Sequence, residues 1–115
     1  MQHVKLSDRE LKVMLAILRC GMDAYGPRIG EKLEEHTGER LSLGALHSAL
    51  ERLEGRGLVD SHMGAATAVR GGRRKRMYEV KAEGQIAVQH AVAVIGRMAE
   101  GVVSPLDEVG EGGVT

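Results

Sequence analysis

The amino-acid sequence predicts a mainly α-helical protein with one small β-hairpin. Apolar residues recur at intervals of three and four in separate stretches of the chain, which is the spacing of helices with one buried face. Residues 58–80 alternate weakly between apolar and polar and have a glycine-rich centre, as two strands and their connection would. With 115 residues, these elements fit one domain with an ordinary core.

Composition determines how that core is built. Aromatic residues make up only 2% of the chain, with no Trp and no Phe, so the core must consist of Leu, Val, Ile, Ala and Met. The single cysteine, Cys20, excludes an internal disulfide and a cysteine zinc cage, and we expect a buried thiol. No apolar stretch approaches the roughly 18 residues of a membrane span, and the N-terminus lacks the apolar core of a signal peptide. We therefore expect a soluble, cytoplasmic protein.

The first helix is predicted from a capping box. In Ser7-Asp8-Arg9-Glu10, the hydroxyl can accept from the Glu10 amide while the carboxylate bonds back to the Ser7 amide. The helix should begin at Asp8, end near Cys20 and form the hub of the core. Its expected apolar stripe consists of Leu11, Met14, Leu15 and Leu18, widened by Val13 and Ile17.

The second helix should be short and the third longer. Pro27 suits a first helical turn, and the second helix should extend to about His36 before Thr37-Gly38. Ser42 then caps a third helix, which Gly55 and Gly57 end before the strand that follows. Its expected buried stripe is Leu43, Leu46, Leu50 and Leu53. The opposite face is small and polar, which suits docking into a groove: Gly44, Ala45, His47, Ser48, Glu51 and Arg52.

Charge is unevenly distributed although the net charge is zero. Residues 1–76 carry 14 basic and 10 acidic side chains, whereas residues 77–115 carry two basic and six acidic ones. The predicted hairpin has a mobile tip at residues 64–72 and a returning strand at about residues 75–80. Cations are densest beside this tip, where phosphate would neutralise their mutual repulsion: Arg70, Arg73, Arg74, Lys75 and Arg76.

A last helix should begin at Lys81 and carry an apolar seam that the preceding elements cannot cover. A second copy of the chain could cover it, so we expect a homodimer. The predicted interface residues are Val88, Ala91, Val92, Ile95, Met98 and Val102. The order of elements is that of a winged helix-turn-helix: a head at residues 1–80, a dimerisation helix at residues 81–102 and a disordered tail at residues 103–115.

Four segments together resemble the PadR-like transcriptional regulators, over about residues 10–84. They are LKVMLAILRCG, AYGPRIGEKLEEHTGERLS, LSLGALHSALERLEGRGLVD and GGRRKRMYEVKAEG, which resemble the family's leading helix, second helix and turn, recognition helix, and wing. The resemblance implies a homodimeric winged helix protein, commonly a repressor, that binds a two-fold symmetric operator in double-stranded DNA.

The predicted DNA-binding residues are Tyr25, Ser42, Gly44, Ala45, His47, Ser48, Arg52, Arg70, Arg73, Arg74, Lys75 and Arg76. Ser48 is expected nearest to base edges, with Arg52 and His47 mainly on phosphate. The five histidines lack the spacing of a metal site, and no nucleophile, base and acid form a catalytic motif, so we expect no metal, no cofactor and no enzyme. The alternative is a winged helix module that binds a protein and does not recognise DNA sequence. The sequence identifies no small-molecule effector.

Overall fold

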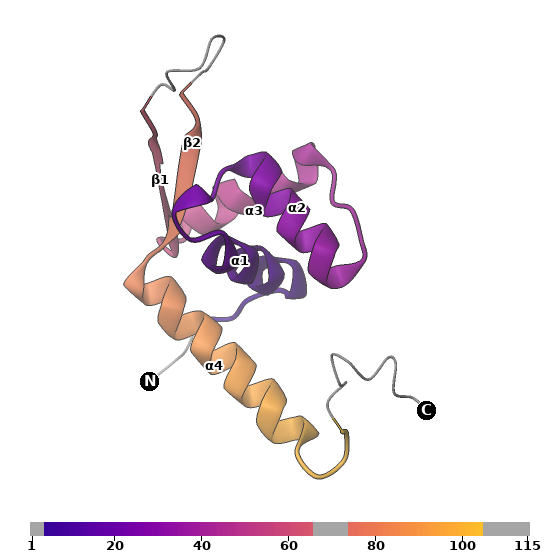
Figure 1. Ribbon diagram of the computed structural model, residues 1–115. Coiled ribbons are helices and arrows are strands. Elements are labelled where there is room, and N and C mark those ends of the chain that lie inside the picture. The colour runs from indigo at the N-terminus through magenta and orange to yellow at the C-terminus, as the bar shows by residue number, and fades with distance from the viewer. Residues whose placement is uncertain (1–3, 66–73, 105–115) are drawn as a thin grey trace.

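The computed structural model describes residues 4–65 and 74–104. It confirms the mainly α-helical class, with a two-stranded antiparallel hairpin beside the helices (Figure 1). The elements are α1 (Asp8–Cys20), a 3-10 turn η1 (Gly21–Asp23), α2 (Gly26–Thr37), α3 (Leu43–Gly55), β1 (Val59–Met63), β2 (Arg76–Val80) and α4 (Ala82–Ala99). We call α1 to β2 the head, and the β1–β2 hairpin the wing.

The helix ends lie where the local sequence predicts them. At α1, the Glu10 amide donates to Ser7 Oγ at 3.0 Å and the Ser7 amide donates to Glu10 Oε1 at 2.9 Å, so the capping box is complete. At α2, Gly38 ends the helix with a φ of 77°, a backbone conformation that glycine adopts without strain. At α3, Ser42 Oγ accepts from the Ala45 amide at 3.1 Å. These predicted boundaries are confirmed because each depends on only a few neighbouring residues.

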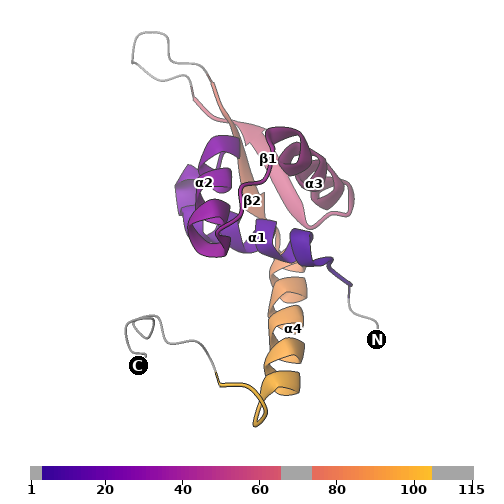
Figure 2. The same ribbon diagram turned by 90° about the vertical axis from the view of Figure 1, so that its right-hand side faces the viewer.

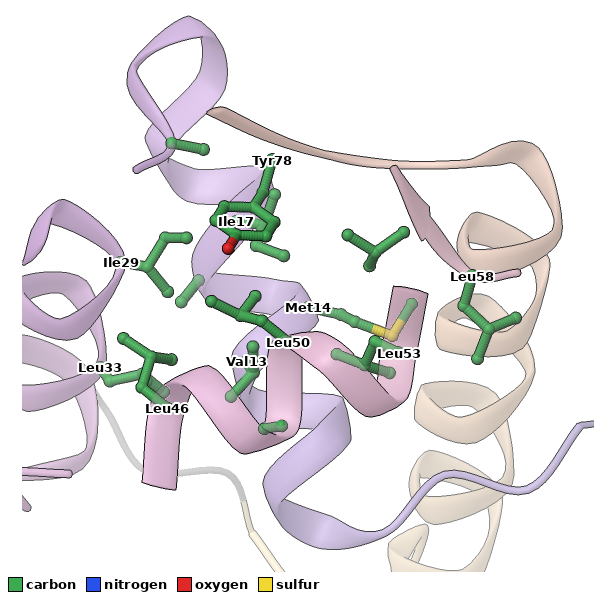
Figure 3. Close-up of a cluster of buried hydrophobic side chains, with 14 of the residues drawn as sticks. Val13, Met14, Ile17, Ile29, Leu33, Leu46, Leu50, Leu53, Leu58 and Tyr78 are labelled. Carbon is green, nitrogen blue, oxygen red and sulfur yellow. The ribbon is translucent and has the colours of Figure 1, made fainter. Parts of the chain in front are cut away.

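The core lies where α1, α2, α3 and the base of the wing meet, with α1 at its centre (Figure 3). Two predicted stripes need correction. On α1, Val13 and Ile17 are fully buried, whereas Leu18 is 39% exposed, because the helix turns its Val13–Ile17 side toward α2 and α3. On α3, Leu43 is 58% exposed because it occupies the first position of the helix, outside the contact between α3 and α2.

The wing is a regular antiparallel ladder that is fastened to the head through β2. Ser61 pairs with Tyr78, and the Tyr78 amide donates to the Ala24 carbonyl at 2.8 Å. The Tyr78 side chain is only 8% exposed, so it packs the ladder onto the core. The predicted tip, with Arg70 and Arg73, lies mostly outside the described residues.

Helix α4 leaves the head and extends away from it (Figure 2). Its first half packs on the head: Gly84, Ala87 and Val88 are buried. The prediction that Val88 belongs to an uncovered seam is therefore wrong, because the head core itself covers this residue. The helix also ends at Ala99, so Val102 lies in the turn beyond it. The predicted tail falls mostly outside the described residues.

Candidate nucleic-acid interface

The outward face of α3 is small and open. Gly44, His47 and Ser48 are exposed, and Ala45 is half-buried. The hydroxyl of Ser42 accepts the Ala45 amide, so this side chain stabilises the start of the helix. The buried positions of α3 lie on the opposite side, which leaves the exposed face free to approach another molecule.

A groove separates α3 from the wing and from the start of α2. It brings together four residues that the sequence marks as DNA-binding, Tyr25, His47, Lys75 and Arg76, although they come from three distant segments. The complete lining is Tyr25, Gly26, Pro27, His47, Glu51, Glu54, Lys75, Arg76 and Tyr78. The groove is therefore lined by acids as well as bases.

The described wing cations all have partners within the protein. Arg74 Nε donates to the Gly64 carbonyl oxygen at 2.9 Å, which ties the two strand ends together. The Lys75 ammonium lies 4.1 Å from the centre of the Tyr25 ring, a cation–π geometry. Arg74 and Lys75 thus have partners within the protein, whereas the sequence suggests phosphate as the partner of these cations.

Arg76 begins a hydrogen-bonded chain that crosses from the wing to α3. Its Nη1 donates to Ser61 Oγ at 3.0 Å, and this hydroxyl donates to Glu54 Oε2 at 2.7 Å. These two hydrogen bonds set the position of the wing relative to the outward face of α3. This position depends on Glu54, which sequence reasoning missed; helical spacing from His47 could have placed this acid on the wing side of the helix.

Arg52 lies on the other flank of α3, away from the groove. Its Nε is 3.9 Å from Glu10 Oε2, and Arg56 Nη1 donates to Glu10 Oε1 at 2.8 Å. Burial alone would raise the pKa of Glu10, but the Ser7 amide and the Arg56 guanidinium outweigh it and hold the pKa below its usual value. The sequence predicts the Ser7 contact, whereas the two arginines lie far away along the chain. Arg52 is thus placed beside the start of α1 by a buried carboxylate.

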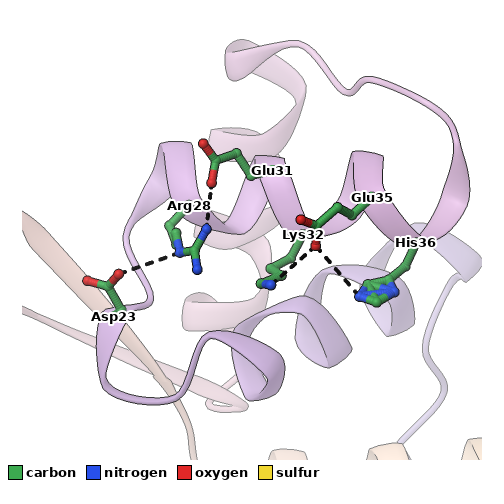
Figure 4. A network of polar contacts seen from close by, with 6 residues as sticks. All are labelled: Asp23, Arg28, Glu31, Lys32, Glu35 and His36. Atoms are coloured by element: carbon green, nitrogen blue, oxygen red, sulfur yellow. Dashed lines mark hydrogen bonds and ion pairs between the residues drawn. The ribbon is translucent and has the colours of Figure 1, made fainter.

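Helix α2 carries its charges in local ion pairs (Figure 4). Arg28 contacts Glu31 at 2.7 Å and Asp23 at 3.5 Å, and Lys32 contacts Glu35 at 3.2 Å. These pairs are largely exposed, and each contributes little to stability. They neutralise most of the charge on this surface, so α2 presents no bare basic patch.

Within residues 4–65 and 74–104, no three His, Cys, Asp or Glu side chains gather in a way that could hold a metal ion. None of the helices in those ranges is long and apolar enough to cross a bilayer. Cys20 is half-buried rather than fully buried, and this burial raises the pKa of its thiol.

The arrangement of three helices, an antiparallel wing and an exposed third-helix face defines the chain as a winged helix-turn-helix protein. Its sequence matches the transcriptional regulator PadR-like family over residues 14–90, and the chain belongs to this family. No protein of curated function matches it in sequence.

Solved structures share the fold. A PadR-like transcription factor from Bacteroides fragilis superposes with a TM-score of 0.64 at 23% identity, covering 82% of this chain and 89% of that one. A PadR family transcription regulator from Clostridium difficile gives 0.59 at 26% identity, covering 77% and 93%. The Aeropyrum pernix ORC1 protein, solved in complex with DNA, gives 0.62 at 23% identity, covering 81% of this chain but 26% of that one.

Proposed function

We propose that this PadR-like regulator is a repressor that binds a two-fold symmetric operator as a homodimer, with α3 in the major groove. The observation that carries the proposal is the exposed, small-residue face of α3 beside a groove that contains His47, Lys75 and Arg76. Small side chains let a helix approach base edges, and cations at the rim contact phosphates. Such a function requires access to the chromosome, hence a cytoplasmic location.

The second half of α4 supports the homodimer. Its exposed apolar side chains lie next to a mostly apolar groove that the segment before α1 forms with α4. A second copy of the chain, related to the first by a two-fold axis, would cover these surfaces. The dimer would then present two α3 helices to successive major grooves. The proposed interface consists of Ala91, Val92, Ile95 and Met98, with Val102 just beyond the helix.

The deciding experiment is selection of bound duplexes from a random pool by the full chain. The proposal requires the selected sequences to share an inverted repeat. Ser48→Glu should abolish binding to the selected duplex, because a carboxylate would then face the base edges and phosphates from the centre of the outward face. Ser104→Glu, the same change in an exposed residue beyond α4, is the matched control and should bind normally.

The alternative is a winged helix module that binds a protein partner. The groove is lined by acids as well as cations, and the charges of α2 are paired, so neither surface distinguishes DNA from a protein partner. The salt dependence of binding separates the two functions. Binding to random duplex DNA that weakens steeply with salt, by about 0.9 in the logarithmic slope for each phosphate contact, supports the DNA-binding proposal. Absence of any binding to duplex DNA at low salt would favour the protein-binding module.

A further inference from the structure

Glu51 occupies the middle of the surface that the proposed function directs at DNA. It is exposed on α3, one helical turn after His47, and it lines the groove beside the wing. Within residues 4–65 and 74–104, its carboxylate makes no hydrogen bond and no ion pair. Burial raises the pKa of Tyr78 and the charge of Glu51 across the groove adds to this rise, but none of the described side chains donates to the Glu51 carboxylate or forms an ion pair with it.

Other acids of the head differ from Glu51 in this respect. Glu54, three residues further along α3, accepts a hydrogen bond from Ser61 Oγ at 2.7 Å. Glu10 accepts from Arg56 at 2.8 Å. Both are held by side chains from other elements, so they contribute to the architecture of the head. Glu51 has no such architectural contact, so its carboxylate is available to a molecule that enters the groove.

DNA makes an unpaired carboxylate at this position unfavourable unless a base offers it a donor. Duplex DNA carries about one negative charge per 1.7 Å of its axis. The phosphates therefore repel the Glu51 carboxylate, and this repulsion weakens binding to any DNA sequence. In the major groove, guanine and thymine present acceptors, and adenine presents its amino group beside the N7 acceptor. Cytosine presents the N4 amino group with no adjacent acceptor on the same base, so it is the best partner for a carboxylate.

We propose that Glu51 is a specificity-determining residue that accepts a hydrogen bond from the N4 amino group of a cytosine in each operator half-site. The inference rests on the proposed function, since it needs α3 in the major groove. Glu51 then lowers the affinity for random DNA and stabilises the complex only where cytosine is present. It therefore increases the ratio of specific to non-specific binding.

The test compares four forms of the full chain: wild type, Glu51→Gln, Glu51→Ala and Glu79→Gln. Glutamine keeps the size of the side chain but can donate as well as accept, so it can also bond to thymine O4. Glu79→Gln removes the same charge from an exposed residue of β2 that lies beside Leu18 and Gln85, on the side of the strand away from α3. It controls for net charge alone.

Each form is titrated with the duplex selected by the wild type, with copies in which each C·G pair is replaced by T·A, and with random duplex. At one position per half-site, the wild type and Glu79→Gln should prefer cytosine by roughly 5- to 150-fold. Glu51→Gln and Glu51→Ala should lose that preference and bind random duplex more tightly than the wild type. Unchanged thermal unfolding would exclude a loss of fold.

Two results would overturn the inference, and only one of them would also refute the proposed function. If the wild type selects an inverted repeat but Glu51→Ala retains every cytosine preference, the role of Glu51 is wrong while the proposed function stands. If the wild type selects no common sequence from the random pool, the proposed function fails and the inference fails with it.

Discussion

The two halves of α4 differ both in apolar content and in surroundings: the second half, residues 91–99, is richer in apolar side chains, yet the head leaves most of it exposed. In the first half, Gly84 and Val88 are buried against the head, whereas in the second half Ile95 is 63% and Met98 is 73% exposed. The difference begins at Gly84, where the absence of a side chain lets the helix backbone approach the Leu58 carbonyl and the start of the wing. The helix thus contributes to two surfaces, one completed within the chain and one that the head leaves exposed and that the proposed homodimer would cover.

The largest expected effect comes from breaking the buried half with Gly84→Ala. The added methyl group would meet the Leu58 carbonyl oxygen, and it would lie 2.9 Å from both Met14 Cε and Val80 Cγ1. We expect a loss of about 3 kcal/mol in the free energy of unfolding, because a backbone oxygen cannot move aside as a flexible side chain can. Thermal unfolding followed by circular dichroism should show a fall in Tm of roughly 10 °C or more. An unchanged Tm would contradict the close packing of α4 on the head.

The exposed half can be broken with Ile95→Asp. In the proposed homodimer this substitution places two carboxylates in an apolar seam, and we expect the dimer dissociation constant to rise by about 100-fold or more. Sedimentation velocity across the micromolar range measures the change. Gln89→Asp, at an exposed polar position of the same helix, should leave the dimer intact. A wild type that stays monomeric at these concentrations would refute the interface.

A third prediction tests the head where its N-terminal segment passes beside α4. Arg56 links this segment to α3, since it donates to Glu10 and to the Lys5 carbonyl oxygen. Glu10→Gln should cost about 1–3 kcal/mol at pH 7, because the acceptor of the part-buried bond from Arg56 loses its negative charge. Urea unfolding of both proteins measures this difference. Glu31→Gln, which affects only an exposed pair with Arg28, should cost less than about 1 kcal/mol.

The difference in the free energy of unfolding between the wild type and Glu10→Gln should depend on pH in a defined direction. The pKa of Glu10 is lower in the folded chain than its ordinary value of 4.5. The stabilisation from the ionised carboxylate is therefore fully present above about pH 4.5, and it is lost as the pH falls through the folded-state pKa. The gap between wild type and Glu10→Gln should narrow over that acidic interval. A gap that widens toward low pH would contradict the ionised Glu10–Arg56 pair.

The smallest effect should come from Gly96→Ala in the exposed half, and it should have the opposite sign to Gly84→Ala. Nothing lies within 4 Å of a methyl group added at Gly96. Alanine should raise the free energy of unfolding by about 0.5–1 kcal/mol, because it restricts the unfolded chain and favours the helix. The measurement is the same thermal unfolding. A fall in Tm would show that a partner chain approaches this glycine closely.

Local signals predicted the framework of the fold. The capping box at Ser7, the cap at Ser42 and the glycine that ends α2 each depend on residues a few positions apart, and all were confirmed. Helical spacing alone did not predict burial correctly on α4, because it does not identify which surface covers an apolar residue. The seam on α4 combined Val88, which the head buries, with Ile95, which the head leaves exposed, because both lie at helical intervals along the same stretch.

The exposure of single residues in the candidate site could be predicted from the sequence, whereas most contacts between distant segments could not. Exposed His47 and Ser48 follow from the position of the leucines on α3. The partners of the cations do not follow from the sequence, because Arg52 meets Glu10 and Lys75 meets Tyr25 only after distant segments come together. Which of these residues contact DNA stays a prediction.

The two tyrosines have a practical consequence for spectroscopy. The chain contains no Trp, and Tyr25 and Tyr78 both line the groove between α3 and the wing. Near-ultraviolet absorption and intrinsic fluorescence of the whole protein therefore originate at one place. Any molecule that enters the groove and separates Lys75 from the Tyr25 ring changes the surroundings of half of the fluorophores. Occupancy of the groove can thus be followed optically in the unlabelled protein.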